Sequence, residues 1–400
     1  MSEQTKTAAA DPRVFAENEN ARAWFIAFLR YGLGLSPRFP NEKMNGDERR
    51  GVYYLGKMHG ISAMTAKAVT DSGHATEKSL AAWKSCVDEA TARFARSETA
   101  LVRLADTMEK NGIPYVPLKG AVVRGLYPSP WRRESTDLDV LVHEADVERA
   151  SELLQSACGY TFARREYHNL VLTIAGGVCL ELHFSLRETM EAPDKVLDTV
   201  WEHTRRVGDT YEYAMTPSFF LFHHMAHMAY HMSHGGIGVK AFVDLKLIRE
   251  KTAIDENEVL ALCEKAGIRH FYEVCVGLCD VWFSETEKKA DDETAALAAF
   301  VLGCGAFGQK ETQAAARRGN DSGTGHFLKR VFVGRDVLEQ IYPKLRQYPF
   351  LLPYYSAKRI ADAVFVRKRA GKFAEELRLG AETSDIAARE NALMKQLELR

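Results

Sequence analysis

The chain has 400 residues, of which 46% are hydrophobic and 27% are charged, and its formal net charge at pH 7 is −1. This length allows two or three domains, or one large core with added helices. The near-zero charge argues against a general attraction to bulk nucleic acid or to an anionic membrane, while a local basic patch still allows a nucleic-acid substrate.

No segment has the pattern of a secretion signal or of a membrane helix. The N-terminus lacks the apolar region of a signal peptide. The most apolar stretch, residues 217–232, contains four histidines and is shorter than the roughly 18 apolar residues of a membrane span. Seven cysteines without a Cys-x-x-Cys pair predict neither a disulfide framework nor a zinc ribbon. We therefore expect a cytoplasmic protein with no membrane partner.

The N-terminal part of the chain predicts helices. Residues 1–12 are expected to be disordered, and residues 13–111 to form helices only. The clearest helix runs from Leu80 to Met108, because its apolar residues recur at nearly the helical period. Gly112 is typical of the C-terminal end of such a helix.

The pattern changes at residue 112, and residues 112–215 predict a compact α/β unit. The expected elements are a strand at 113–118, a short helix at 121–126, a strand at 137–142, a helix ending at Gly159 and strands at about 168–175 and 178–184. The last two strands flank Gly176-Gly177, which is typical of a hairpin turn. Residues 216–400 again predict helices. The expected fold class is therefore α+β, with a small mixed-sheet unit inserted between α-helical regions.

Two aspartates on one predicted strand are the strongest candidates for chemistry. Asp137 and Asp139 are two positions apart, so both side chains leave the same face of the strand. Neighbouring carboxylates repel each other unless a cation lies between them, and Mg²⁺ prefers oxygen ligands of this kind. Taken alone, the pattern also fits a solvated pair at the start of a strand.

A third acid lies on a later strand. Between Leu180 and Phe184 the apolar residues alternate with Glu181 and His183, which therefore share the opposite face. An acid on that face can approach the aspartates, and two metal ions can then hold the attacking and leaving oxygens of a phosphoryl displacement. The aspartate pair and Glu181 are thus the predicted catalytic and metal-binding residues.

The segment before the aspartates suits a phosphate group. Lys119 and Gly120 stand where a predicted strand runs into a short helix. Helix N-terminal amides attract phosphate, glycine allows close backbone approach, and lysine adds a positive charge. Arg133, in the loop that follows, can reach the same anion. Each of these residues, taken alone, also fits an ordinary turn or a surface charge.

Several motifs together carry a resemblance to a known family. They are Leu118-Lys-Gly120, Leu126-Tyr-Pro128, Arg133, Thr136-Asp-Leu-Asp-Val-Leu-Val142, Gly159-Tyr160 and Leu180-Glu-Leu-His183. Over about residues 100–360 the chain resembles the uncharacterised bacterial nucleotidyltransferase family, a divergent branch of the DNA polymerase beta-like nucleotidyltransferase superfamily. By this resemblance, Asp137 and Asp139 match the metal-binding pair and Glu181 matches the third acid. The chain departs from the superfamily in having Lys119-Gly120 in place of a Gly-Ser pair, and a glutamate where an aspartate is more usual.

The resemblance implies a nucleotidyltransferase-fold α/β unit and a metal-dependent transfer reaction. The group transferred would be a nucleoside monophosphate, AMP from ATP in the first instance, with Mg²⁺ or Mn²⁺ as cofactor. ATP or another nucleoside triphosphate would bind through Lys119, Gly120 and Arg133. The acceptor stays open among a small molecule, a protein and an RNA end. A different interpretation is a non-catalytic nucleotide-sensing or interaction protein on the same fold.

A histidine-rich helix is predicted to begin at Pro217. His223, His227 and His231 lie at i, i+4 and i+8 and form one stripe. The stripe fits a structural helix interface, or a helical metal site, since two histidines four residues apart can bind zinc. It also fits the lining of a nucleotide or acceptor pocket.

In the pocket interpretation, four residues add to the nucleotide site. They are His183, His227, His231 and Lys240. Lys240 and Asp244 share a face of the following helix and also fit a simple helix pair.

Overall fold

The computed structural model describes most of the chain. The described residues are 15–40, 43–305, 338, 345, 348–365 and 384–399. The chain divides into two compact units, the first formed by Met1–Tyr230 and Ile237–Ala306 and the second by His231–Gly236 and Phe307–Arg400. The segment 1–12, predicted to be disordered, lies outside the described residues.

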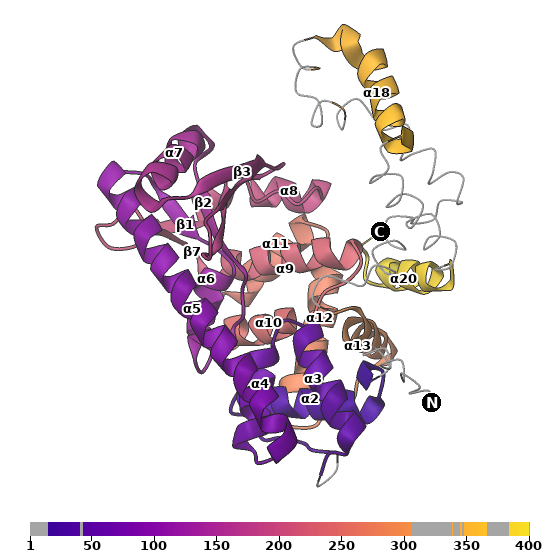
Figure 1. Cartoon of the computed structure of the whole chain (residues 1–400). Coiled ribbons are helices and arrows are strands. Elements are labelled where there is room, and N and C mark those ends of the chain that lie inside the picture. The colour runs from indigo at the N-terminus through magenta and orange to yellow at the C-terminus, as the bar shows by residue number, and fades with distance from the viewer. Residues whose placement is uncertain are drawn as a thin grey trace, which may run out of the picture. The chain divides into compact units, whose positions relative to one another are not determined.

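The first unit contains the sheet and most of the helices (Figure 1). Its longer helices are α2 (Glu19–Gly32), α3 (Gly46–Met58), α4 (Ser62–Asp71), α5 (Glu77–Asn111), α7 (Val147–Cys158), α10 (Val239–Lys251), α11 (Glu256–Lys265), α12 (Arg269–Phe283) and α13 (Asp292–Cys304). Its short helices are α6 (Gly120–Val123), α8 (Glu191–Leu197), η1 (Arg124–Leu126), η2 (Pro130–Arg132), η3 (Glu144–Asp146) and η4 (Val200–His203). Helix α9 (Pro217–Ser233) begins in the first unit, and its residues from His231 belong to the second. In the second unit the described elements are η5 (Pro349–Leu351), α18 (Leu352–Phe365) and α20 (Ser384–Gln396).

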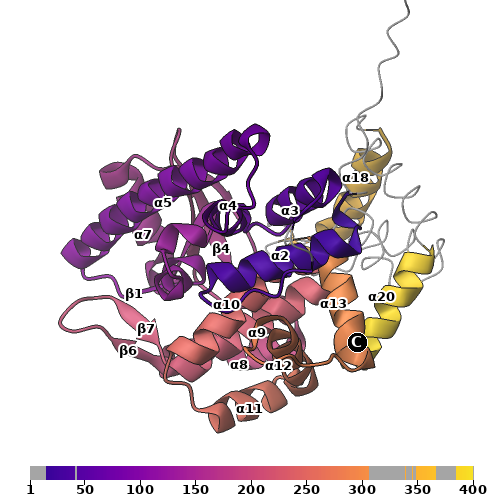
Figure 2. The same ribbon diagram turned by 90° about the horizontal axis from the view of Figure 1, so that it is seen from below.

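Local sequence signals explain where several helices begin and end. The Asn45 side chain accepts hydrogen bonds from the first turn of α3, and Glu48 bonds back to the Asn45 amide, forming a capping box. Helix α5 ends at Gly112, whose φ of 64° is the left-handed conformation that glycine adopts readily. The predicted end of this helix is therefore confirmed. Helices α2, α3 and α4 gather at one end of α5 (Figure 2).

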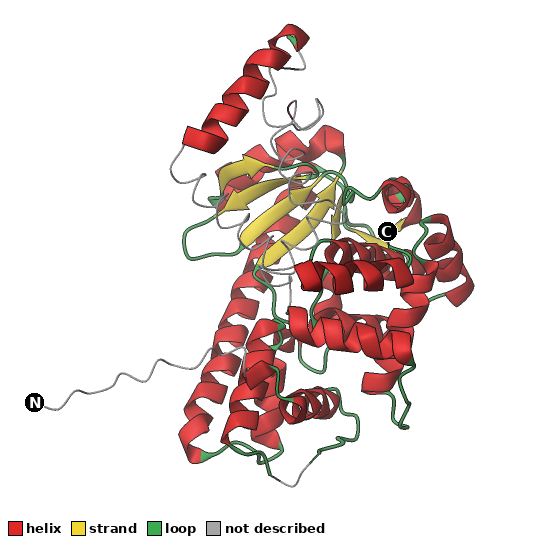
Figure 3. Ribbon diagram, turned by 90° about the vertical axis from the view of Figure 1, so that its right-hand side faces the viewer, coloured by secondary structure: helices red, strands yellow, loops and turns green. Residues whose placement is uncertain are grey.

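The strands form a five-stranded mixed sheet and a separate two-stranded ribbon (Figure 3). The strands are β1 (Tyr115–Pro117), β2 (Asp137–Val142), β3 (Thr161–Arg165), β4 (Asn169–Thr173), β5 (Cys179–His183), β6 (Thr204–Arg206) and β7 (Tyr213–Met215). The sheet order is β1-β2-β5-β4-β3, in which β2 and β5 are parallel and the other pairs are antiparallel. The expected α+β class with a mixed sheet is confirmed, and the domain boundaries at 111/112 and 215/216 stay predictions.

One face of the sheet carries the core, which leaves the other face for the site. Leu138, Val140, Leu180 and Leu182 are buried together with apolar residues of α5 and α7. Because side chains alternate along a strand, the residues between them point to the opposite face. The fold thus presents Asp137, Asp139, Glu181 and His183 as one row on adjacent strands. Among the described residues, no helix is both long enough and apolar enough to cross a membrane.

Candidate metal and nucleotide site

The register of two parallel strands brings three side chains together. Asp139 on β2 lies opposite Glu181 on β5, and Leu141 lies opposite His183. One ligand atom each of Asp139, Glu181 and His183 lies within 4.8 Å of the others. The His183 Nε2 atom is 3.0 Å from Asp139 Oδ1 and 3.5 Å from Glu181 Oε2. The strands therefore place two carboxylates and one imidazole around a common point.

Lys119 supplies a positive charge at the same point. Its Nζ lies 3.3 Å from Asp139 Oδ1. Lys119 stands in the turn between β1 and α6 with φ of 42° and ψ of −116°, a conformation that side-chain-bearing residues rarely adopt. Residues in such strained conformations persist only where the surrounding structure holds them in place, and they cluster at functional sites.

The ionisation states within the group follow from these contacts. Burial alone would raise the pKa of Asp139, but the Lys119 ammonium and the His183 hydrogen bond outweigh burial and hold this pKa well below its usual range. Burial would lower the pKa of His183, and its hydrogen bonds to Asp139 and Glu181 raise it instead. The pKa of Lys119 is raised by the carboxylates, against the effect of burial. Asp139 is therefore an anion, ready to hold a cation.

A second layer of side chains orients the group. Asn169 is fully buried, and its Nδ2 donates a hydrogen bond of 3.0 Å to Glu181 Oε2. The ring of His168 stacks on the ring of His183, with centroids 5.2 Å apart. Burial and the neighbouring His183 lower the pKa of His168, so His168 packs as a neutral ring. Asn169 and His168 carry no sequence signal of their own. Their positions on β4 and just before it become informative only once β4 is paired with β5.

Asp137 lies on the same face but outside the converging group. Its Oδ1 accepts a hydrogen bond of 2.8 Å from Ser135 Oγ, which also donates to the Asp137 carbonyl. In the strand register it stands opposite Cys179, two positions before the Asp139–Glu181 pair. Its assignment as a metal ligand stays a prediction.

Arg133 forms a buried ion pair with a distant helix. Its guanidinium binds Asp244 of α10 through Nε and Nη2, at 3.1 and 2.8 Å from Oδ2. The Tyr127 hydroxyl donates to the same carboxylate at 2.6 Å. Asp244 therefore pairs with Arg133 and not with Lys240, which lies one turn before it on the same helix. The Lys240 Nζ donates to the Glu134 carbonyl at 3.2 Å, and burial and Arg133 lower the pKa of Lys240 to about 8.

The histidines of α9 have separate environments. His223 is buried, and burial together with Lys119 lowers its pKa to about 3, so its ring is neutral. The His227 Nδ1 atom lies 2.7 Å from Glu188 Oε1. His231 belongs to the second unit. Among the described residues, the side chains whose ligand atoms converge are those around Asp139, and the stripe of α9 is not such a group.

Glu188 links α9 to the converging group of Asp139, Glu181 and His183, and sequence reasoning missed it. The Glu188 carboxylate raises the pKa of Lys119. It also raises the pKa of His223, against the larger lowering effect of burial. Glu188 therefore lies near both residues. The Glu188 amide donates to Asp194 Oδ1 at 2.8 Å, and the adjacent Thr189 has a φ of 66°. A single acid in a loop carries no sequence signal, because its partners come from other elements.

The donor set fits a divalent cation. Carboxylate oxygens suit Mg²⁺ and Mn²⁺, and an imidazole nitrogen is compatible with Mn²⁺ and later transition metals. Asn169 holds Glu181 and His168 holds His183 in the way that outer partners fix metal ligands. Converging carboxylates on adjacent strands, beside a half-buried lysine, define the kind of site used by metal-dependent phosphoryl-transfer proteins.

Comparison with protein families agrees with this class. Residues 46–284 match the family described as uncharacterised nucleotidyltransferase. Because the match covers more than half of the chain, the protein belongs to this nucleotidyltransferase family. No curated protein and no solved structure matches the chain.

Proposed function

We propose that the protein transfers a nucleoside monophosphate, AMP from ATP in the first instance, to an acceptor hydroxyl or phosphate. The observation that carries the proposal is the convergence of Asp139, Glu181 and His183 beside Lys119, in a chain of the nucleotidyltransferase family. Mg²⁺ or Mn²⁺ would be held by these three side chains, with Asp137 at the edge of the group. A bound divalent cation would polarise the phosphate oxygens of the nucleotide.

The side chains of the site then have distinct tasks. Lys119 stands at the turn before α6, where its ammonium can leave Asp139 for a phosphate oxygen and neutralise the triphosphate. Gly120 leaves room at the same turn, because a Cβ there would lie 3.2 Å from both Arg133 Nη1 and Ser135 Oγ. Arg133, fixed on Asp244, holds the loop that carries Ser135 against Asp137.

The reaction itself exchanges one bond to the α-phosphorus for another. The acceptor oxygen attacks the α-phosphorus, the bond to the bridging oxygen breaks, and pyrophosphate leaves. The proton of the acceptor passes to a base of the site, for which Glu181 is the proposed candidate since it is the more exposed of the two converging carboxylates. The acceptor is a small molecule, a protein or an RNA end.

Label transfer tests the proposal. ATP labelled in the α-phosphate is incubated with the protein, a divalent cation and a cell extract, and the label that becomes bound to other molecules is counted. We expect transfer by the wild type and a loss of about 100-fold or more in Asp139→Asn, since a metal ligand is removed. Asp88→Asn, an exposed change on α5, is the matched control and should keep the activity. Full metal-dependent transfer by Asp139→Asn would refute the assignment.

A further inference from the structure

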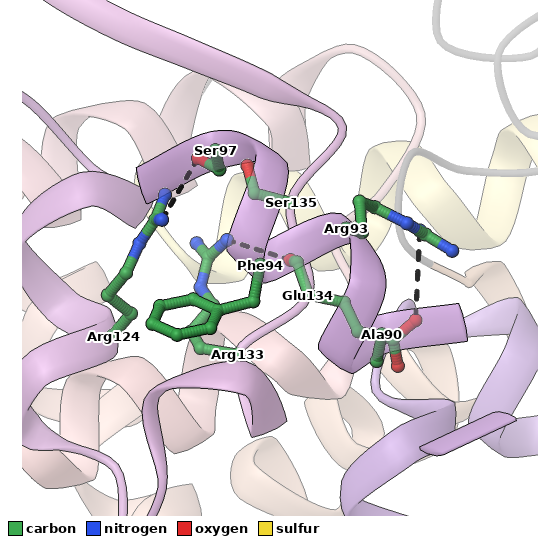
Figure 4. A pocket seen from close by; sticks show the side chains of 8 residues that line it. All are labelled: Ala90, Arg93, Phe94, Ser97, Arg124, Arg133, Glu134 and Ser135. Atoms are coloured by element: carbon green, nitrogen blue, oxygen red, sulfur yellow. Dashed lines mark hydrogen bonds and ion pairs between the residues drawn. The ribbon is translucent and has the colours of Figure 1, made fainter. Parts of the chain in front are cut away.

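A group of arginine side chains lies next to the turn of Lys119 and Gly120, which is proposed to bind phosphate. A pocket is lined by residues of α5, by Arg124 at the start of η1 and by Arg133, Glu134 and Ser135 before β2 (Figure 4). None of Asp139, Glu181 and His183 lines it. From α5 the pocket receives Arg93, Phe94 and Ser97. Three guanidinium groups therefore meet one carboxylate in its lining.

Arg124 has a donor that the described residues leave unused. Its side chain is 6% exposed. Nε donates to the Gly120 carbonyl at 2.8 Å, and Nη1 donates to Ser97 Oγ and Glu98 Oε1. Nη2 is buried and has no hydrogen-bond partner among the described residues. A buried, unsatisfied donor on a charged group is costly, so an acceptor from outside the described residues would stabilise this atom.

The one carboxylate in the lining is already engaged. Glu134 Oε1 accepts hydrogen bonds from the Ala63 amide at 2.8 Å and from Ser62 Oγ at 3.0 Å, at the N-terminus of α4. Arg93 lies farther from Glu134, with Nη1 3.9 Å from Oε2. Glu98, which pairs with Arg124, is 44% exposed, and solvent weakens such a pair. Arg133 and Arg124 also repel each other, because Arg133 lowers the pKa of Arg124 beyond the effect of burial.

We propose that this pocket binds a phosphoryl group through Arg93, Arg124 and the hydroxyl of Ser97. Guanidinium groups present several donors in a fixed plane, which matches the oxygens of a phosphate. The pocket is narrow in this structure, with space for a water-sized group. Arg93, about one third exposed, would have to move outward to admit the larger anion.

The phosphoryl group has two sources with the same chemistry. Arg124 binds the Gly120 carbonyl and Ser135 binds Asp137, so the pocket is joined to the nucleotide site at two points. One source is thus the terminal phosphate of the nucleoside triphosphate, and this source rests on the proposed function. The other is a phosphate on a separate molecule such as the acceptor, which does not depend on ATP binding.

Calorimetry with pyrophosphate tests the pocket independently of the metal-binding group. Titrations are made without divalent cations on the wild type and on Arg93→Gln. We expect binding by the wild type, and an affinity lower by roughly ten- to a hundredfold in Arg93→Gln, since a charge-assisted hydrogen bond is lost. Arg96→Gln, an equal charge change at an exposed position of α5, is the control and should bind like the wild type.

A titration with ATP and Mg²⁺ then separates the two sources. A weaker affinity for ATP in Arg93→Gln assigns the pocket to the terminal phosphate of the nucleotide. An unchanged affinity for ATP, with weaker pyrophosphate binding, assigns it to a phosphate on a second molecule. The proposal is overturned if the wild type binds neither phosphate nor pyrophosphate, or if Arg93→Gln and Arg96→Gln bind pyrophosphate equally well. Loss of ATP binding in Asp137→Ala/Asp139→Ala alone concerns the nucleotide site and leaves the pocket standing.

Discussion

At the scale of single residues, the partners of a buried histidine decide whether its ring can carry a charge. His183 gains two carboxylate partners and its pKa rises. His59 is fully buried, stacks on Phe25 with ring centroids 5.6 Å apart, and accepts a hydrogen bond from the Val239 amide through Nδ1. Burial lowers the pKa of His59 to about 3. The same residue type is thus a candidate ligand on the sheet and a neutral core ring between the helices.

Because His59 is neutral in the folded protein, the free energy of unfolding should fall in acid. Its pKa is lower in the folded than in the unfolded chain, so below about pH 6.5 the unfolded state binds more protons and stability falls. The loss attributable to His59 should reach ~2 kcal/mol at pH 5 and continue to grow toward pH 3. His59→Asn, which keeps an acceptor for the Val239 amide, should lose correspondingly less between pH 7.5 and pH 5. Free energies of unfolding from urea titrations check this, and equal losses in both proteins would contradict it.

At this scale, the sequence predicts correctly which side chains share a face of a strand, because only neighbours along the chain decide this. The alternation around Asp137 and Asp139, and around Glu181 and His183, fixes which side chains share a face. It does not fix which of them converge, because that depends on the register between β2 and β5. The ion pair of Arg133 with Asp244, 111 positions apart, has no local signal for the same reason.

At the scale of elements, helix packing in the N-terminal part depends on close backbone approach. Gly51 lies on α3 against α2 and the preceding segment. A Cβ at this position would lie 2.5 Å from Ala21 Cβ and closer still to the Phe15 carbonyl oxygen. The first is the side chain of a buried residue of α2 and the second is a backbone atom, so neither can move away cheaply.

Gly51→Ala should therefore destabilise the protein. We expect a loss of about 1–3 kcal/mol from overpacking, despite the better helix propensity of alanine. Gly46→Ala on the same helix is the control, since no heavy atom lies within 4 Å of its Cβ position, and it should be neutral or slightly stabilising. Thermal unfolding of both variants measures the difference. A Gly51→Ala protein as stable as Gly46→Ala would show that α2 and α3 are not packed this closely.

The elements that sequence reasoning missed are those without an apolar pattern. All five residues of β3 (Thr161–Arg165) are exposed, so the strand lacks the buried apolar residues that mark β2 and β5. The helix α8 has seven residues and an internal Pro193, too little for a helical period to show. In contrast, α7 and its end at Gly159 were predicted from an amphipathic pattern and a terminal glycine.

At the scale of the whole molecule, the first unit joins its N-terminal helices to the helices that follow the sheet. Arg30 of α2 is 2% exposed and donates to the carbonyls of Ser36, Trp282 and Ser284, the last at 2.6 Å. Glu134, next to Arg133, binds the N-terminus of α4. The loop before Asp137 is thus braced from both helical regions, and the α/β unit is not independent of them.

Replacing Arg30 should weaken the first unit as a whole. In Arg30→Met three hydrogen bonds to backbone carbonyls are lost, and we expect a loss of about 2–4 kcal/mol with a single cooperative transition. Arg38→Met is the matched control, because Arg38 donates to the same Ser284 carbonyl from a more exposed position, and it should cost less than about 1 kcal/mol. Urea unfolding followed by far-UV circular dichroism gives both values. Equal costs for the two variants would contradict the structural role of Arg30.

The central claim is that the carboxylates on β2 form a metal-dependent nucleotide site. It is tested most directly by calorimetric titration of ATP into the wild type and into Asp137→Ala/Asp139→Ala, each with and without Mg²⁺ or Mn²⁺. We predict that the wild type binds ATP when the divalent cation is present, and that removing either the cation or the two aspartates abolishes binding. Equal binding by the double variant, or no binding of any nucleoside triphosphate by the wild type, would contradict the account.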